Sequence, residues 1–202
     1  MNDITLSMAL VDFIPVIVCA ASVMIQIRVF RAKMQTLFYV LFVLGGIMLV
    51  AGGVLKALWK LLYALELGDF QLLSDQFLPV SGAAFVLLAV ASIRMLIGSG
   101  RSGYQYAFMA SSRIPFIAMM FFGMTGWYMS LSVLSFRLKK KGIGLLFILA
   151  WIIMTVTSMF STKFDSAQSA MHWIAEVINI FAQLMLLTGT IALRRALREE
   201  YY

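Results

Sequence analysis

The sequence predicts an all-α, polytopic integral membrane protein with six transmembrane helices. Its 202 residues are 62% hydrophobic and only 12% charged, whereas a soluble domain is about 45–50% apolar and about 25% charged. Six apolar runs also approach or exceed the roughly 20 residues that span a bilayer as a helix. Because lipid offers no hydrogen-bond partner to the backbone, we expect these runs to be helical. Together they predict a single transmembrane domain over residues 1–202.

The six runs follow one another with short connections. The first contains Pro15 and carries Asp12 near its start. The second is longer than spanning requires, and its paired glycines suit close helix packing. Residues 104–113 precede the fourth run and resemble an aromatic segment at the membrane surface. We expect the six helices at about 8–29, 36–62, 76–98, 112–136, 142–161 and 168–193.

The two halves of the chain, 1–100 and 101–202, resemble each other weakly. Ile14-Pro15 recurs as Ile114-Pro115, and a glycine-rich connection over 98–103 separates the halves. The pattern is compatible with a 3+3 internal pseudo-repeat. Three crossings in each repeat would place the halves in opposite orientations, as in many transporters.

The basic residues do not fit six simple crossings well. Cytoplasmic loops usually collect Lys and Arg, yet alternating crossings divide the 16 basic residues 7 to 9. One crossing more or less between Arg94 and Arg137 would instead gather 13 on one side. A re-entrant segment over 104–136 would produce that change. Six simple crossings remain the primary prediction, and under them a Lys56–Glu176 pair is not expected, because the two residues lie on opposite faces.

A polar stripe in the last apolar run is the best candidate site. At about 100° per residue, four polar side chains lie within a sector of about 60°. Burying ionised Glu176 is costly unless it is paired, and the only histidine of the chain lies one turn before it. We interpret the stripe as a ligand or proton pathway, with interhelical hydrogen bonds of about 1 kcal/mol each as the structural alternative. The stripe consists of His172, Glu176, Asn179 and Gln183, with Thr190, Asp165 and Gln168 extending it.

Three charged residues in other segments are secondary candidates. We expect Asp12 to be exposed at the membrane surface or to cap a helix. Lys56 and Lys60 are expected to snorkel toward the headgroups, with pairing to Glu176 or to the acidic loop after the second run as the alternative. Cys19 and the four tryptophans read as packing or interface residues.

These residues favour transport of a small solute or ion through the helix bundle. The alternatives are a non-catalytic membrane sensor or a subunit of a larger membrane complex, and an intramembrane acid–base enzyme acting on a lipid. The last is disfavoured, since no His-Glu-x-x-His motif is present and Ser81-Gly82 is preceded by Pro79-Val80, without the first glycine of a Gly-x-Ser-Gly motif. We expect no metal, no cofactor and no nucleic acid. The net charge of +7 indicates anionic lipids at the basic loops, in a cell or inner membrane. A homo-oligomer or a membrane protein partner is compatible with this reading.

Overall fold

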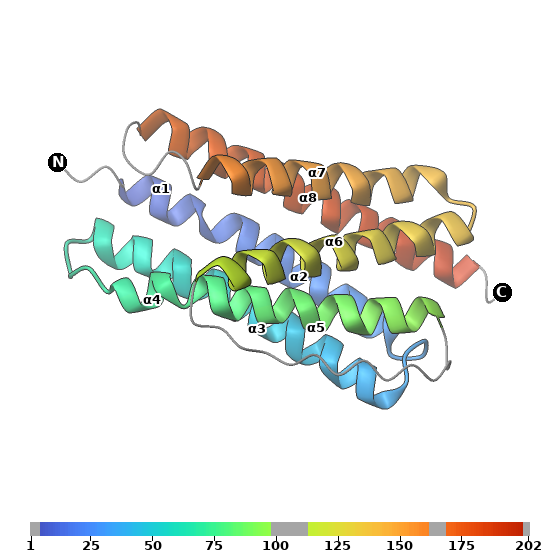
Figure 1. The fold of residues 1–202 in the computed structure, drawn as a ribbon. Helices are drawn as coiled ribbons and strands as arrows, with labels where there is room; N and C mark the ends of the chain where they lie inside the picture. The colour runs from blue at the N-terminus through green and yellow to red at the C-terminus, as the bar shows by residue number, and fades with distance from the viewer. Residues whose placement is uncertain (1–4, 98–112, 162–168, 200–202) are drawn as a thin grey trace.

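The computed structural model describes residues 5–97, 113–161 and 169–199, and all regular structure in these ranges is helical (Figure 1). The fold is therefore the all-helical one that the composition predicts. The helices pack side by side as one elongated bundle. They are α1 (Leu6–Val11), α2 (Phe13–Phe30), α3 (Thr36–Ala64), α4 (Gln71–Asp75), α5 (Phe77–Ile97), α6 (Arg113–Arg137), α7 (Lys141–Ser161) and α8 (Ser169–Glu199).

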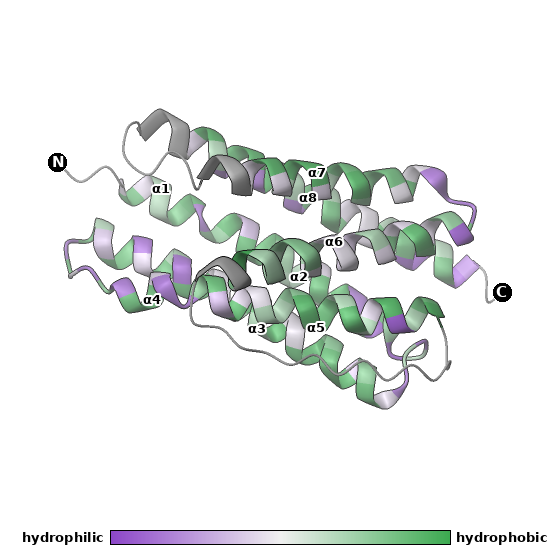
Figure 2. Cartoon of the chain, viewed as in Figure 1, coloured by the Kyte–Doolittle hydropathy of each residue, from purple (hydrophilic) through white to green (hydrophobic). Residues whose placement is uncertain are grey.

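Five stretches within the described residues are long and apolar enough to cross a membrane: Leu6–Phe30, Thr36–Ala64, Gln71–Ile97, Phe116–Arg137 and Trp173–Glu199. The sixth predicted span falls on α7, whose described apolar stretch, Lys141–Thr157, is shorter. Hydrophobic residues cover much of the length of the helices, and polar residues gather mainly toward the two ends (Figure 2). The chain is thus compatible with an integral membrane protein.

The first span is interrupted at Asp12, which joins α1 to α2. Pro15 has no backbone N–H and its ring disfavours a helical carbonyl four residues earlier, at Val11. The interruption therefore has a local cause in the sequence. It places the Asp12 side chain inside the bundle, with only 8% of the residue exposed. The prediction that Asp12 is exposed or caps a helix is wrong, since the side chain makes no cap hydrogen bond either.

Close contacts at glycines show whether neighbouring helices run parallel or antiparallel. Gly46 lies against Val23 and Gly53 against Val16, so α2 and α3 are antiparallel. The contacts of α3 with α5 are antiparallel in the same way. Between α5 and α6, however, the numbers rise together: Gly123 lies against Phe85 and Gly126 against Ala89. These two consecutive long helices are parallel, so Ile97 and Arg113 lie at opposite ends of the bundle (Figure 1).

The remaining contacts close the bundle. Trp151 donates to Thr125 between antiparallel α6 and α7, and Gly189 packs on Phe147 between antiparallel α7 and α8. The last helix returns to α2 and runs parallel to it (Figure 1), because Gln26 donates to Thr190 toward one end while Asp12 and Glu176 meet at Lys60 toward the other. Consequently α2–α3–α5 and α6–α7–α8 follow the same sequence of directions.

The primary prediction of six simple alternating crossings is therefore wrong, because α5 and α6 are consecutive long helices that run parallel. The halves do not have opposite orientations, because the close contacts make α5 parallel to α6 and α2 parallel to α8. The alternative of a re-entrant segment over 104–136 does not hold either where the region is described, because α6 is a continuous helix of 25 residues. Residues 104–112 lie outside the described part of the chain. Because α5 and α6 are parallel, the segments after α6 lie at the opposite end from where simple alternation would place them. This gathers most basic residues of the described chain at one end, as their distribution in the sequence indicates.

Charge is divided between the two ends of the bundle. The end that contains the C-termini of α2, α5, α6 and α8, here called the basic end, carries most of the cations. The other, the acidic end, contains the start of α1, the loop from α3 to α5 and the start of α8, with Glu66, Asp69 and Asp75. The basic end carries Arg28, Arg31, Lys33, Arg94, Arg137, Lys139, Lys140, Lys141, Arg194, Arg195 and Arg198.

Side-specific labelling of introduced cysteines tests this arrangement. In a Cys19→Ala background, we expect Leu67→Cys and Lys139→Cys to react with an impermeant maleimide from opposite sides of the membrane, because they lie at opposite ends of the bundle. Both residues are exposed. Arg31→Cys is the control and should label with Lys139→Cys. Six simple alternating crossings give the reverse result, with positions 67 and 139 on one side and position 31 on the other.

Candidate functional site

The most unusual feature of the bundle is a buried ionic cluster of Asp12, Lys60 and Glu176. The Lys60 ammonium lies 2.6 Å from Oε1 of Glu176 and 3.1 Å from Oδ2 of Asp12. Only 12% of the lysine side chain and 11% of each carboxylate side chain are exposed. The cluster thus joins the α1–α2 junction, α3 and α8, which are far apart in sequence.

The local sequence explains why these three side chains meet. Asp12 is held at the interruption between α1 and α2. Lys60 lies in the last turns of the long α3, beyond the close α2–α3 contact at Gly53. Glu176 lies two turns into α8, on the side that faces α2 and α3. The prediction that Lys60 snorkels is therefore wrong, and the alternative, pairing with Glu176, is what the structure contains.

Lys56 does not join the cluster directly. It lies one turn before Lys60 on α3, and its ammonium is 4.5 Å from the centre of the Phe77 ring on α5. This distance is typical of a cation–π contact. Lys56 therefore adds positive charge next to the cluster while its own contact is to an aromatic face.

The other members of the predicted stripe continue along the same face of α8. Gln183 is buried, with 7% exposed, and its Nε2 donates to Sδ of Met154 on α7 at 3.8 Å. Within the described residues, Oε2 of Glu176, Oδ1 of Asn179 and Oε1 of Gln183 are buried and have no hydrogen-bond partner. The side chain of His172 and residues 165 and 168 lie outside what the structure describes.

A second polar group lies nearer the basic end. Gln26 Nε2 donates to Thr190 Oγ1 at 2.9 Å, and Trp127 Nε1 donates to Gln26 Oε1 at 3.1 Å. All three residues are at most 2% exposed. The network ties α2, α6 and α8 together in the centre of the bundle. Fully buried Leu186 lies between it and Gln183 on α8.

Polar side chains therefore follow α8 from Glu176 through Asn179 and Gln183 to Thr190, a series that we call the α8 polar line. At 1.5 Å per residue it extends about 21 Å along the helix. The sequence aligned Glu176, Asn179 and Gln183 on one face of the helix, and the structure buries Glu176 and Gln183 inside the bundle. The sequence missed the roles of Gln26 and Trp127, although an amide in the middle of an apolar run was a usable signal.

The chemistry available here is proton exchange and hydrogen bonding. In the described ranges, His, Cys, Asp and Glu residues form no group of three that could hold a metal ion. A buried acceptor without a donor costs about 1–3 kcal/mol. Three such oxygens at helical spacing can therefore accept a hydrogen bond from a water or a protonated group, or coordinate a small cation.

Comparison of the chain with protein-family models, with curated proteins and with solved structures found no match.

Proposed function

We propose that the bundle transports a small solute or ion along the α8 polar line, coupled to proton movement at the Asp12–Lys60–Glu176 cluster. The observation that carries the proposal is the set of buried acceptor oxygens without donors on Glu176, Asn179 and Gln183. A buried acceptor without a partner destabilises the protein. A donor or cation that moves along the line would satisfy that acceptor while it is bound. Intramembrane acids are typical of such pathways.

The cluster supplies the coupling. Two carboxylates share one ammonium, so the three groups carry a net negative charge when all are ionised. Binding one proton makes the cluster neutral and leaves Lys60 with a single ionised partner. The Lys60–Glu176 bond would then be exchanged for Lys60–Asp12 alone, and Glu176 would be free to contact Asn179 or a solute. Protonation of the cluster thereby changes the contacts of Glu176, which lies on α8 with the rest of the polar line.

The same proposal includes the placement in the membrane. α7 is taken as the sixth crossing, and the basic end as the cytoplasmic end, because cytoplasmic segments collect Lys and Arg. The cluster then lies near the outer surface of a cell or inner membrane. A 3+3 repeat with these helix directions relates halves of the same orientation, a plan found in some transporters.

Glu176→Gln in reconstituted vesicles tests the function. After an acid pulse, vesicles with the unaltered protein and a trapped pH-sensitive dye should acidify faster than protein-free vesicles. We expect Glu176→Gln to slow this uptake at least about tenfold, since removing a positioned proton-transfer group ordinarily costs that much or more.

Glu199→Gln is the matched control, because Glu199 also pairs with a lysine but is exposed. It should leave the uptake unchanged. Equal rates for Glu176→Gln and the unaltered protein would contradict coupling at this residue. Equal rates for vesicles with and without the unaltered protein would contradict proton movement through the bundle.

A further inference from the structure

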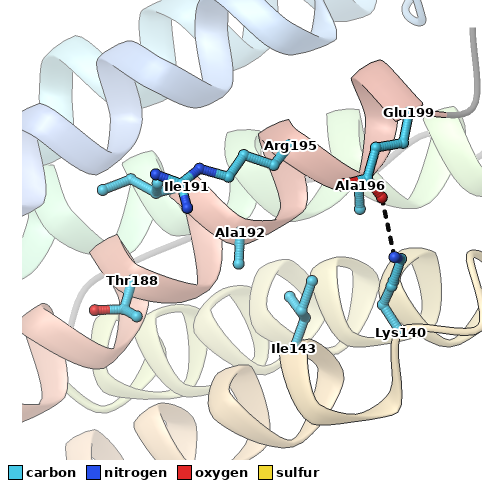
Figure 3. Close-up of a pocket in the computed structure, with 8 residues that line it drawn as sticks. All are labelled: Lys140, Ile143, Thr188, Ile191, Ala192, Arg195, Ala196 and Glu199. Carbon is cyan, nitrogen blue, oxygen red and sulfur yellow. Dashed lines mark hydrogen bonds and ion pairs between the residues drawn. The ribbon is translucent and has the colours of Figure 1, made fainter. Parts of the chain in front are cut away.

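A groove at the basic end lies between α7 and α8, well away from the cluster. Its cavity measures about 260 Å³. Lys140, from the loop before α7, lies on one side and Arg195 and Glu199 of α8 lie on the other (Figure 3). Its apolar wall consists of Ile143, Ile191 and Ala192.

The charges of the groove are not balanced. Nζ of Lys140 lies 3.0 Å from Oε2 of Glu199, so these two neutralise each other. The Arg195 side chain instead extends back along α8 toward Ile191 (Figure 3). Among the described residues it has no acidic partner. The groove therefore presents one guanidinium whose charge is not neutralised, beside apolar side chains.

The position of the guanidinium indicates what kind of anion fits. Arg195 lies near the end of the apolar stretch of α8, and Ile191 and Ala192 belong to that stretch. A ligand in the groove would thus meet a guanidinium and aliphatic side chains next to one another (Figure 3). Arginine is well suited to phosphate because its planar fork donates two parallel hydrogen bonds. A phosphate that carries acyl chains matches both features, whereas free phosphate would leave the apolar wall unused.

We propose that this groove binds an anionic phospholipid, with the headgroup phosphate on Arg195 and one acyl chain along Ile143, Ile191 and Ala192. Lys139 and Lys141 flank Lys140 in the sequence. They increase the local positive potential that attracts such a lipid. The site is independent of transport along the α8 polar line.

Binding of short-chain lipids to the purified full-length chain in mild detergent tests the proposal. The probes are dioctanoyl phosphatidylglycerol, dioctanoyl phosphatidylcholine and inorganic phosphate, with binding followed by native mass spectrometry. We expect saturable binding of phosphatidylglycerol that is tighter than binding of the other two. Arg195→Ala should weaken it about fivefold, as expected for one cation near a membrane surface. Ala192→Trp should weaken it as well, by filling the groove without changing charge.

Arg28→Ala is the matched control, because Arg28 is an exposed cation at the same end but on α2. The affinity of the Arg28→Ala variant for phosphatidylglycerol should stay within about twofold of the affinity of the unaltered protein. Equal weakening by Arg28→Ala and Arg195→Ala would overturn the proposal in favour of diffuse attraction to the basic end. Binding of inorganic phosphate as tight as that of phosphatidylglycerol would overturn the lipid assignment, and so would unchanged binding in Ala192→Trp. A melting temperature measured for each variant confirms that it is folded.

Discussion

Lys60→Met is expected to destabilise the protein by about 3–5 kcal/mol, the cost of leaving a buried charge without its partner. Lys60 is the only cation within 4 Å of Asp12 and Glu176 among the described residues. Removing it leaves two buried carboxylates close together without a direct ionic partner. Equilibrium unfolding in mixed micelles measures the loss.

Two further variants make that result specific to burial. Lys140→Met breaks the Lys140–Glu199 pair, in which 48% and 66% of the side chains are exposed, and should cost less than about 1 kcal/mol. The triple variant Asp12→Asn, Lys60→Met, Glu176→Gln removes all three charges and should recover much of the lost stability. Equal losses for Lys60→Met and Lys140→Met would show that the cluster is not a buried ionic contact.

Gly123→Ala is expected to destabilise the protein by about 1–3 kcal/mol, the usual cost of overpacking a tight contact. A Cβ at this position would lie 2.6 Å from the carbonyl carbon of Phe85 and 2.7 Å from the amide nitrogen of Val86. These are backbone atoms of α5, so no side chain can turn away to make room. The two parallel helices would have to separate.

Gly142→Ala provides the comparison for that variant. Nothing lies within 4 Å of a Cβ at Gly142, and alanine has the higher helix propensity by about 1 kcal/mol. The same chemical change should therefore leave the melting temperature unchanged or raise it slightly. A loss of stability at Gly142 equal to that at Gly123 would contradict the close α5–α6 approach.

The sequence predicted the positions of the helices because the bilayer imposes a simple requirement, namely a run of about 20 apolar residues. α3 and α6 begin and end within about two residues of the predicted bounds, the usual uncertainty of helix ends. The hydropathy of the sequence did not predict that α5 and α6 are parallel. Hydropathy is counted along each run and carries no information on the direction in which the next run begins.

The candidate site was likewise predicted only in part. Helical periodicity aligned Glu176, Asn179 and Gln183, because all three lie on one helix and share its repeat. Lys60 is separated from Glu176 by 116 positions, and no periodicity relates them. For a lysine near the end of a long helix, extending the side chain to the headgroups costs less free energy than burying its charge, so the sequence favours snorkelling. Only the packing of α1 on α3 and of α8 on α2 reveals that its ammonium is held inside.

The ionic cluster also has a consequence for how the protein is made. Asp12 and Lys60 belong to the first two long helices, so we expect them to pair with each other before the rest of the chain is made. Glu176 is added by the last span, after all the others are in place. A carboxylate in that span can be accommodated because a lysine already waits in the bilayer. We therefore expect Asp12 to neutralise the Lys60 charge during synthesis until Glu176 becomes available.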